Sequence, residues 1–465
     1  MTGTFSSLNT ALSALRYQRV AMDVASNNIA NLSSEGYVRR RAEAQALGAP
    51  EQIAMWSRYD GVGDGVSSAS VTRLADPLLD ARARREHGTQ SYLDTRVAVL
   101  SRLESGVGEP GASGVSAALA DFRNSWQDLQ THPEQGASRS QVLATGRALA
   151  QAINGQASNV DSELAEQRSH LLDLVSQINS AASSLAAVNR SIADANGGGL
   201  DDSDLRDQRD VLAMRLSELT GSEAKARPDG GVDVLVGGVP LVVGQTAGTF
   251  TITGGVAPDG TSDGAPLSFA VVGSAGSTAV SPAAVGGEAG ATSELITTTL
   301  PGYRAGLDSV ASLLADAVNA LHTSGYDLNG NPGQAFFSYD PLNASGSLAV
   351  ALTDPDDVAA SSVPGGGLDT GVAEALGNAQ VADEAYRRLV SGLGTEVASS
   401  RRLGDNQRLL TTQVDNAREQ LVGVNIDEET TNLMAAQRAY EAASRVMSTM
   451  DSVLDTLINR TGLVR

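Results

Sequence analysis

The stretch "LNTALSALRYQRVAMDVASNNIANLSSEGY", residues 8–37, carries apolar side chains at a spacing of seven residues and then turns polar. This spacing is typical of the a and d positions of a coiled coil, so it predicts a long helix with one apolar seam. The polar tract at its end contains no histidine, no cysteine and no pair of carboxylates, which argues against a catalytic loop. The residues assigned to this seam are Leu8, Leu15, Met22, Ile29 and Leu32.

A second seam of the same period lies near the other end of the chain, within residues 433–457. The two seams indicate helices that lie along each other; the simpler alternative is that each packs on its own domain. Residues 1–45 carry five arginines against three acids, and residues 415–465 carry eight acids against five arginines, which weakly favours pairing. Burial along two seams does not offset the entropy cost of ordering both helices, so we expect further copies of the chain to add contacts. The residues of this seam are Leu433, Tyr440, Met447, Met450, Leu454 and Leu457.

The composition excludes several classes of function. A net charge of −21 over 465 residues disfavours nucleic acid and anionic membranes as partners, because both require a basic face. The absence of cysteine removes disulfides, thiolate metal ligands and cysteine nucleophiles. No secretory signal is visible at the start of the chain, and we expect no apolar run to approach the length of a membrane span.

Helical periodicity dominates the middle of the chain, with one interruption. The expected helices cover residues 115–129, 138–196, 205–219, 300–321, about 375–422 and about 427–460. Residues 66–74 read as a strand, and β-branched runs separated by Gly, Asp and Pro in 221–299 predict antiparallel hairpins. We expect these glycine-rich strands to offer little apolar surface to the rest of the chain, as an inserted domain whose ends lie close together.

We therefore predict a mainly α fold with an inserted β domain, containing paired N- and C-terminal coiled-coil helices, a long-helix bundle and a small antiparallel β domain. The three predicted domains are a terminal coiled-coil axial domain (1–60 with 423–465), a helical rod or bundle domain (61–220 with 300–422) and the inserted β domain (221–299).

No segment offers a convincing chemical site. Residues 327–331 place Asp, Asn and Asn where a calcium loop begins, but Pro332 and Ser338 stand where such a loop needs Gly and a bidentate Glu. The histidines have no metal-ligand spacing, and we expect them on helix surfaces. They are His87, His132, His170 and His322. We predict no enzyme, no cofactor and no metal.

The segment "ANLSSEGY", residues 30–37, resembles the ANxxTxGY signature of the bacterial flagellar axial proteins, which form rod, hook and hook-associated structures. The matching positions, with Ser34 where the family usually has Thr, are Ala30, Asn31, Ser34, Gly36 and Tyr37. Glu35 stands where the family often has Pro, which implies a less rigid turn.

Three longer stretches narrow the resemblance to the hook-associated protein 1 family (FlgK), the hook–filament junction proteins. They are "DLRDQRDVLAMRLSEL" (204–219), "LPGYRAGLDSVASLLADAVNALHTSGYDLNGNPGQAFF" (300–337) and "GVNIDEETTNLMAAQRAYEAASRVMSTMDSVLDTLIN" (423–459). The shorter segment "VTRLADPLL" (71–79) also fits, and the resemblance fades in 221–300.

This resemblance implies a secreted, structural protein of the extracellular flagellum, cytoplasmic before its export by the flagellar type III apparatus. It implies a ring of copies at the hook–filament junction, formed by the paired terminal helices. The implied partners are other copies of the chain, the hook protein, the second hook–filament junction protein and an export chaperone on the C-terminal segment. The alternatives are another axial protein (hook or distal rod protein) and a coiled-coil surface adhesin.

Overall fold

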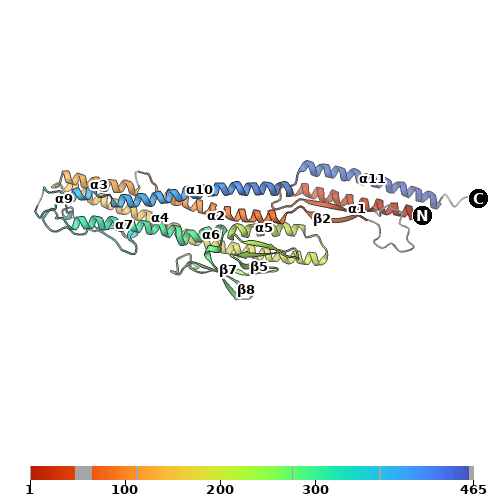
Figure 1. Cartoon of the computed structure of the whole chain (residues 1–465), viewed down its shortest axis with the longest axis horizontal. Helices are drawn as coiled ribbons and strands as arrows, with labels where there is room; N and C mark the ends of the chain where they lie inside the picture. The colour runs from red at the N-terminus through yellow and green to blue at the C-terminus, as the bar shows by residue number, and fades with distance from the viewer. Residues whose placement is uncertain (1, 48–64, 112–113, 275, 366–367, 460–465) are drawn as a thin grey trace, which may run out of the picture.

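The computed structural model describes residues 2–47, 65–111, 114–274, 276–365 and 368–459. The chain forms a long, narrow molecule built mostly of helices, with the first and last helices at the same tip (Figure 1). Its long helices and small antiparallel sheets confirm the predicted fold class. The predicted boundary between residues 60 and 61 lies outside the described residues, and the division into three domains stays a prediction.

The first and last helices lie side by side, and we name them the axial pair (Figure 1). Helix α1 spans Thr2–Ala30 and helix α11 spans Ile426–Asn459. A hairpin of β1 (Arg40–Ala46) and β2 (Val66–Arg73) covers another side of α1. Strand β2 confirms the strand expected at 66–74, whereas β1 was not predicted from the sequence.

Two long helices, α2 (Pro77–Val107) and α10 (Val381–Val422), continue the molecule beyond the axial pair. Asp76 starts α2 by accepting hydrogen bonds from the backbone amides of Leu78 and Leu79, and Pro77 follows it at a position where no amide proton is needed. The helices are antiparallel, because ion pairs join the first turn of α2 to the end of α10 and the end of α2 to the middle of α10.

Helix α4 (Gly136–Gly198) runs along most of this body, packed against α3 (Val115–Thr131) and α5 (Ser203–Thr220). Among the described helices it alone is long and apolar enough to cross a membrane by length and composition, contrary to our expectation that no such run exists. Its apolar side chains are buried in two separate cores of the protein, which is the behaviour of a core helix.

The strands of residues 223–280 form two antiparallel sheets beside α4 and α5 (Figure 1). The first sheet has the order β3-β4-β5-β6 and the second β7-β8-β9. The strands are β3 (Glu223–Ala226), β4 (Val232–Val236), β5 (Val239–Val243), β6 (Thr246–Ala247), β7 (Thr249–Gly254), β8 (Ser268–Gly273) and β9 (Gly276–Val280).

The expectation that these strands offer little apolar surface is wrong. Phe250 and Phe269 are fully buried and stack with ring centroids 5.2 Å apart. They share one core with apolar residues of the second half of α4, including Leu171 and Ile178, and with Leu216 of α5. Glycine marks the turns between these strands, while the β-branched and aromatic residues within them form the buried layer.

The two ends of the strand segment do lie close together, as expected, because the Gly286 amide donates to the Thr220 carbonyl at 2.8 Å. Helix returns earlier than expected, at Gly287 instead of Leu300. Helix α6 (Gly287–Glu294) continues through a π-helical turn, η2 (Leu295–Thr299), into α7 (Leu300–Thr323). The wider π-turn accommodates Pro301, which lacks an amide proton, without ending the helix.

The far end of the molecule closes with short elements over α3 and α7. They are β10 (Phe337–Ser338), α8 (Ala344–Ser347), β11 (Ala349–Val350) and α9 (Gly371–Asn378), with the 3₁₀ turn η3 at Pro355–Asp357. The 3₁₀ turn η1 (Pro282–Ala284) lies elsewhere, against α6. The helix expected at about 375–422 is therefore two helices, α9 and α10, which separate at residues 379–380.

A cluster of aromatic rings fills the core at this end, formed by Phe122, Trp126, Phe336 and Phe337. His322 belongs to it and is fully buried, so the expectation of a surface histidine is wrong for this residue. Its Nε2 accepts from the Ala359 amide at 2.8 Å, and its Nδ1 lies 2.6 Å from the Gln334 carbonyl oxygen. These bonds fix the neutral tautomer that carries its proton on Nδ1.

We expect the free energy of unfolding to fall as the pH drops from about 6.5 to about 4, because burial lowers the pKa of His322 to about 4. Because the histidine pKa is lower in the folded protein than in the unfolded chain, the unfolded chain takes up a proton at a higher pH. The contribution of His322 to the free energy of unfolding is therefore complete above the unfolded pKa and is lost on acidification. The loss at the acid end is up to about 3 kcal/mol. Urea unfolding across this range measures it.

The matched comparison uses His322→Gln, which cannot titrate, and His132→Gln at the exposed end of α3. The first variant should lose this part of the pH dependence and the second should keep it. An unchanged pH profile for His322→Gln would contradict the assignment.

Candidate assembly interface

The N-terminal seam lies on α1, which packs beside α11, and it is only partly buried. Leu8, Leu15, Met22 and Ile29 are half-buried, and the small residues Ala11 and Ala25 between them are buried. Leu32 lies beyond the end of α1 and is 41% exposed, so the helical seam ends before it. The polar tract that begins at residue 31 ends the helix at Ala30.

The C-terminal seam lies on α11 with a similar partial cover. Leu433, Met447, Met450 and Leu454 are half-buried, and Tyr440 is 37% exposed. Leu457 lies within α11, but its side chain is outside the described set. A single copy of the chain therefore leaves the larger seam side chains of both helices partly open to solvent.

The turn motif, Ala30 to Tyr37, is stabilised by local hydrogen bonds of its own polar side chains. Asn31 Nδ2 donates to the Asn27 carbonyl at 3.0 Å, and the Ser34 hydroxyl donates to Asn31 Oδ1 at 3.1 Å. Gly36 has a left-handed backbone with φ of 75°, and a Cβ at this position would lie 2.2 Å from Val211 Cγ2. Glycine is thus required both by the turn and by the close approach to α5.

The turn motif leads into a buried polar cluster at the base of the axial pair, which we name the axial joint: Asn28, Tyr37, Arg39 and Glu429. Asn28 is fully buried at its centre. Its Oδ1 accepts from the Tyr37 hydroxyl at 2.9 Å and from the Arg40 amide at 3.0 Å, and its Nδ2 donates to the Arg40 carbonyl and to Glu429 Oε2, each at 2.9 Å. This side chain therefore ties α1, the turn and α11 together.

Glu429 is the acidic member of the axial joint and is only 2% exposed. Arg39 neutralises it, with Nε at 2.9 Å and Nη2 at 2.6 Å from Glu429 Oε1. Arg39 also reaches Glu428 at 2.8 Å, and its amide donates to the Val422 carbonyl at 3.0 Å. A buried carboxylate of this kind is tolerated only while its cation and its hydrogen bonds are present.

A second set of ion pairs joins the joint to α5. Arg73 of β2 contacts Asp207 and Asp210, and Arg40 contacts Asp204 and Asp207. Burial raises the pKa of Asp207, although both arginines oppose the effect. Burial likewise raises the pKa of the Tyr37 phenol in the joint. The axial pair is thus fixed to the body through charged groups at its base.

Sequence reasoning predicted the seams and the turn motif but missed the axial joint. A signal was present, because "RRR" at 39–41 and "DEE" at 427–429 carry opposite charges immediately beside the two seams. These charges do not reveal the role of Asn28. An asparagine within a helix is unfavourable by itself, and its role here depends on four hydrogen bonds that only the structure shows.

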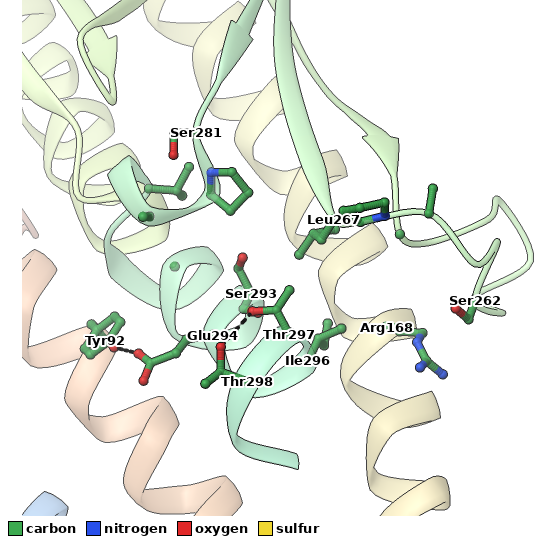
Figure 2. A pocket seen from close by; sticks show the side chains of 17 residues that line it. Tyr92, Arg168, Ser262, Leu267, Ser281, Ser293, Glu294, Ile296, Thr297 and Thr298 are labelled. Carbon is green, nitrogen blue, oxygen red and sulfur yellow. Dashed lines mark hydrogen bonds between the residues drawn. The ribbon is translucent and has the colours of Figure 1, made fainter. Parts of the chain in front are cut away.

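A cavity of about 750 Å³ lies between the β7–β8 loop, α4 and η2 (Figure 2). Its one carboxyl, Glu294, accepts a hydrogen bond from the Tyr92 hydroxyl and pairs with Arg96. Burial raises the pKa of Glu294, and Glu396 adds to the effect. Glu294 forms no hydrogen bond with the hydroxyls of Ser293, Thr297 or Thr298, and no histidine or second carboxylate stands among the described residues that line this cavity, so these hydroxyls form no catalytic set.

The described ranges contain no group of three or more His, Cys, Asp and Glu side chains that could hold a metal ion. In the segment that resembled a calcium loop, the Asp327 carboxylate accepts from the amide and the side chain of Asn331 at 2.7 and 3.0 Å. It thereby shapes a turn instead.

Comparison with known proteins decides the family. Residues 100–337, half of the chain, match the model of the "flagellar hook-associated protein FlgK helical domain". The chain belongs to the FlgK family. Models of rod proteins match both ends, the "flagella basal body rod protein" over 8–37 and the "flagellar basal body rod FlgEFG protein C-terminal" over 420–460. These two matches cover both seams.

Similar proteins align with this chain over nearly its whole length. The chain is 29% identical to flagellar hook-associated protein 1 of Bacillus subtilis, with 100% of this chain and 99% of the relative aligned. It is 24% identical to that of Escherichia coli, over 97% and 99%. The solved flagellar hook junction protein FlgK from Burkholderia pseudomallei matches 74% of this chain and 100% of its own, with 16% identity and a TM-score of 0.64, which shows the shared fold.

As a FlgK-family member, the chain is a structural component of the flagellum at the hook–filament junction and not an enzyme. It belongs to the extracellular flagellum and associates with other flagellar components. The alternatives of a hook protein, a distal rod protein or a surface adhesin are set aside by the match to the FlgK helical domain.

Proposed function

We propose that the chain assembles as a ring between hook and filament, with the axial pairs of neighbouring copies packed against one another. The observation that supports this is the partial cover of both seams, whose larger side chains stay half-exposed in a single copy. Apolar side chains in such a stripe gain free energy when a neighbour removes them from water.

The outer faces of the axial pair add to this apolar surface. Leu12 on α1 and Met434, Val446 and Val453 on α11 are all more than a third exposed. A helix that is apolar on more than one face is typical of a helix that packs against several neighbours. A ring places each axial pair between two others and so covers these faces.

The remaining assignments of partner and route rest on the family. We propose that the ring contacts the hook protein on one side and the second hook–filament junction protein on the other. Export would proceed from the cytoplasm through the flagellar type III apparatus, with a chaperone on the C-terminal segment until export. The axial domain (1–60 with 423–465), the helical domain (61–220 with 300–422) and the inserted β domain (221–299) stay our proposed division.

Seam substitutions test the ring. Leu15→Asp or Leu454→Asp puts a charge where copies of the axial pair would pack, so we expect the protein to be exported but absent from the hook tip, leaving hooks without filaments. Electron microscopy of the cells and assay of the medium for the protein measure both results.

The matched controls Ser26→Asp and Gln437→Asp add the same charge at exposed positions of α1 and α11. Because the ring also covers the outer faces that carry Leu12 and Met434, these controls should impair filaments less than the seam variants do. Normal filaments with both seam variants would refute the proposed role of the axial pair. A circular dichroism spectrum equal to that of the parent protein excludes unfolding as the cause of any loss.

A further inference from the structure

A groove of about 480 Å³ runs between α2 and strand β3. One wall is α2 from Ala81 to Tyr92, and the other is the chain from Gly221 to Lys225. Strand β3 is an edge strand, with β4 as its one strand neighbour in the described part of the chain. Half of its backbone groups therefore have no ladder partner.

Three cations line this groove: Arg84 and Arg85 on α2 and Lys225 on β3. Across the described ranges, none of the three side chains forms a hydrogen bond or an ion pair. The one acid among the lining residues is Glu223, which is exposed. The groove is thus a local excess of positive charge on a protein whose net charge is −21.

The positive charge of Arg84 is not neutralised by a carboxylate of the same chain. The two carboxylates that act on its charge, Asp80 and Asp210, are already paired, Asp80 with Arg418 at 2.8 Å and Asp210 with Arg73 at 2.9 Å. Burial lowers the pKa of Arg84, so its charge lies in a partly desolvated position without a counter-charge of its own. Such a guanidinium gains free energy when a carboxylate from outside binds it.

We propose that this cationic groove binds a carboxylate-bearing segment of a second copy of the chain. The inference rests on the proposed ring, because assembly at the junction brings copies together. A second copy is the occupant that the charges favour, since 54 acids against 33 basic residues give it an excess of carboxylates. The exposed Leu200, in the adjoining groove that shares Arg84, offers an apolar contact beside the charges.

The contact is heterologous, because a basic groove on one copy meets an acidic surface on the next. Contacts of this kind generate rings when the rotation closes. The groove would thus set the position of each helical body relative to its neighbour, while the axial pairs supply the apolar contact. Electrostatic complementarity of this type contributes chiefly to orientation and specificity.

Lys225 provides the test, because it is the one lysine of the sequence. A carbodiimide joins an amine and a carboxylate into an amide with loss of water and adds no spacer. Treatment of isolated intact flagella should produce a covalent dimer of the chain, in which peptide mapping finds Lys225 joined to an Asp or Glu of a second copy.

Three variants test which side chains the covalent dimer requires. Lys225→Arg keeps the charge but removes the amine, so the protein should stay in the flagella and the dimer should disappear. Arg85→Glu reverses an exposed groove cation and should strongly reduce the dimer, whereas Arg82→Glu, exposed one turn earlier on α2 and outside the groove, should not.

The outcomes are distinct for the two proposals. If the chain is present at the junction but Lys225 forms only links within one copy, or links to a different protein, the groove proposal is wrong and the ring proposal stands. If the chain is absent from isolated flagella, the ring proposal fails and the groove proposal fails with it.

Discussion

Replacement of residues 223–285 by a short Gly/Ser linker is expected to unfold the second half of α4 together with α5. The linker can span the gap, because Thr220 and Gly286 are hydrogen bonded to each other. The deletion removes the apolar layer that covers Leu171, Leu174, Ile178 and Leu185 of α4 and Leu216 and Leu219 of α5. Exposure of these side chains costs on the order of 10 kcal/mol, which is comparable to the whole stability of an ordinary domain.

Circular dichroism with thermal melting, and hydrogen exchange resolved along α4, measure this effect. Residues 136–164 of α4 belong to the other core, with α3 and α7, and should stay protected. A milder pair of variants lies on one strand. Phe269→Ala, at a fully buried position, should lower the free energy of unfolding by about 3–5 kcal/mol, and Val272→Ala, at a position that is 43% exposed, by far less. Full helicity after the deletion would show that the strands are an independent appendage, as the sequence alone suggested.

Arg39→Ala is expected to release α11 from α1 at the axial joint. The substitution leaves Glu429 buried with Asn28 as its remaining hydrogen-bond donor in the joint. Loss of the cation from such a pair costs about 3 kcal/mol, since the charge of Glu429 can neither reach water nor find another partner without opening the helix pair. Hydrogen exchange in the first turns of α11 should accelerate roughly hundredfold as a result.

Arg41→Ala is the matched control, because Arg41 is exposed and lies two residues further along the chain, in β1. It should leave exchange in α11 unchanged. Glu429→Gln should rescue part of the loss in the Arg39→Ala background, because an amide removes the buried charge but keeps a hydrogen-bond acceptor for Asn28. Equal exchange rates in Arg39→Ala and the parent chain would mean that the apolar seam alone holds the pair.

The sequence by itself determined the parts of this protein that repeat locally. The seven-residue period defined the seams of α1 and α11, because side chains three and four residues apart share a helix face wherever the chain lies. The polar turn after Ala30, the cap at Asp76 and the alternation of β-branched residues with glycine near 230–280 depend on neighbouring residues in the same way. Such features can be predicted without any knowledge of the fold.

The tertiary structure alone decided what lies between segments distant in sequence. Nothing local shows that Asn28 meets Glu429, that His322 is buried among aromatic rings, or that the strands cover the second half of α4. The helix resumption at Gly287 was hidden because a π-turn absorbs Pro301, which reads as a helix start. Burial of polar groups and apolar faces is set by partners hundreds of residues away, and a single sequence carries no direct record of which partners meet.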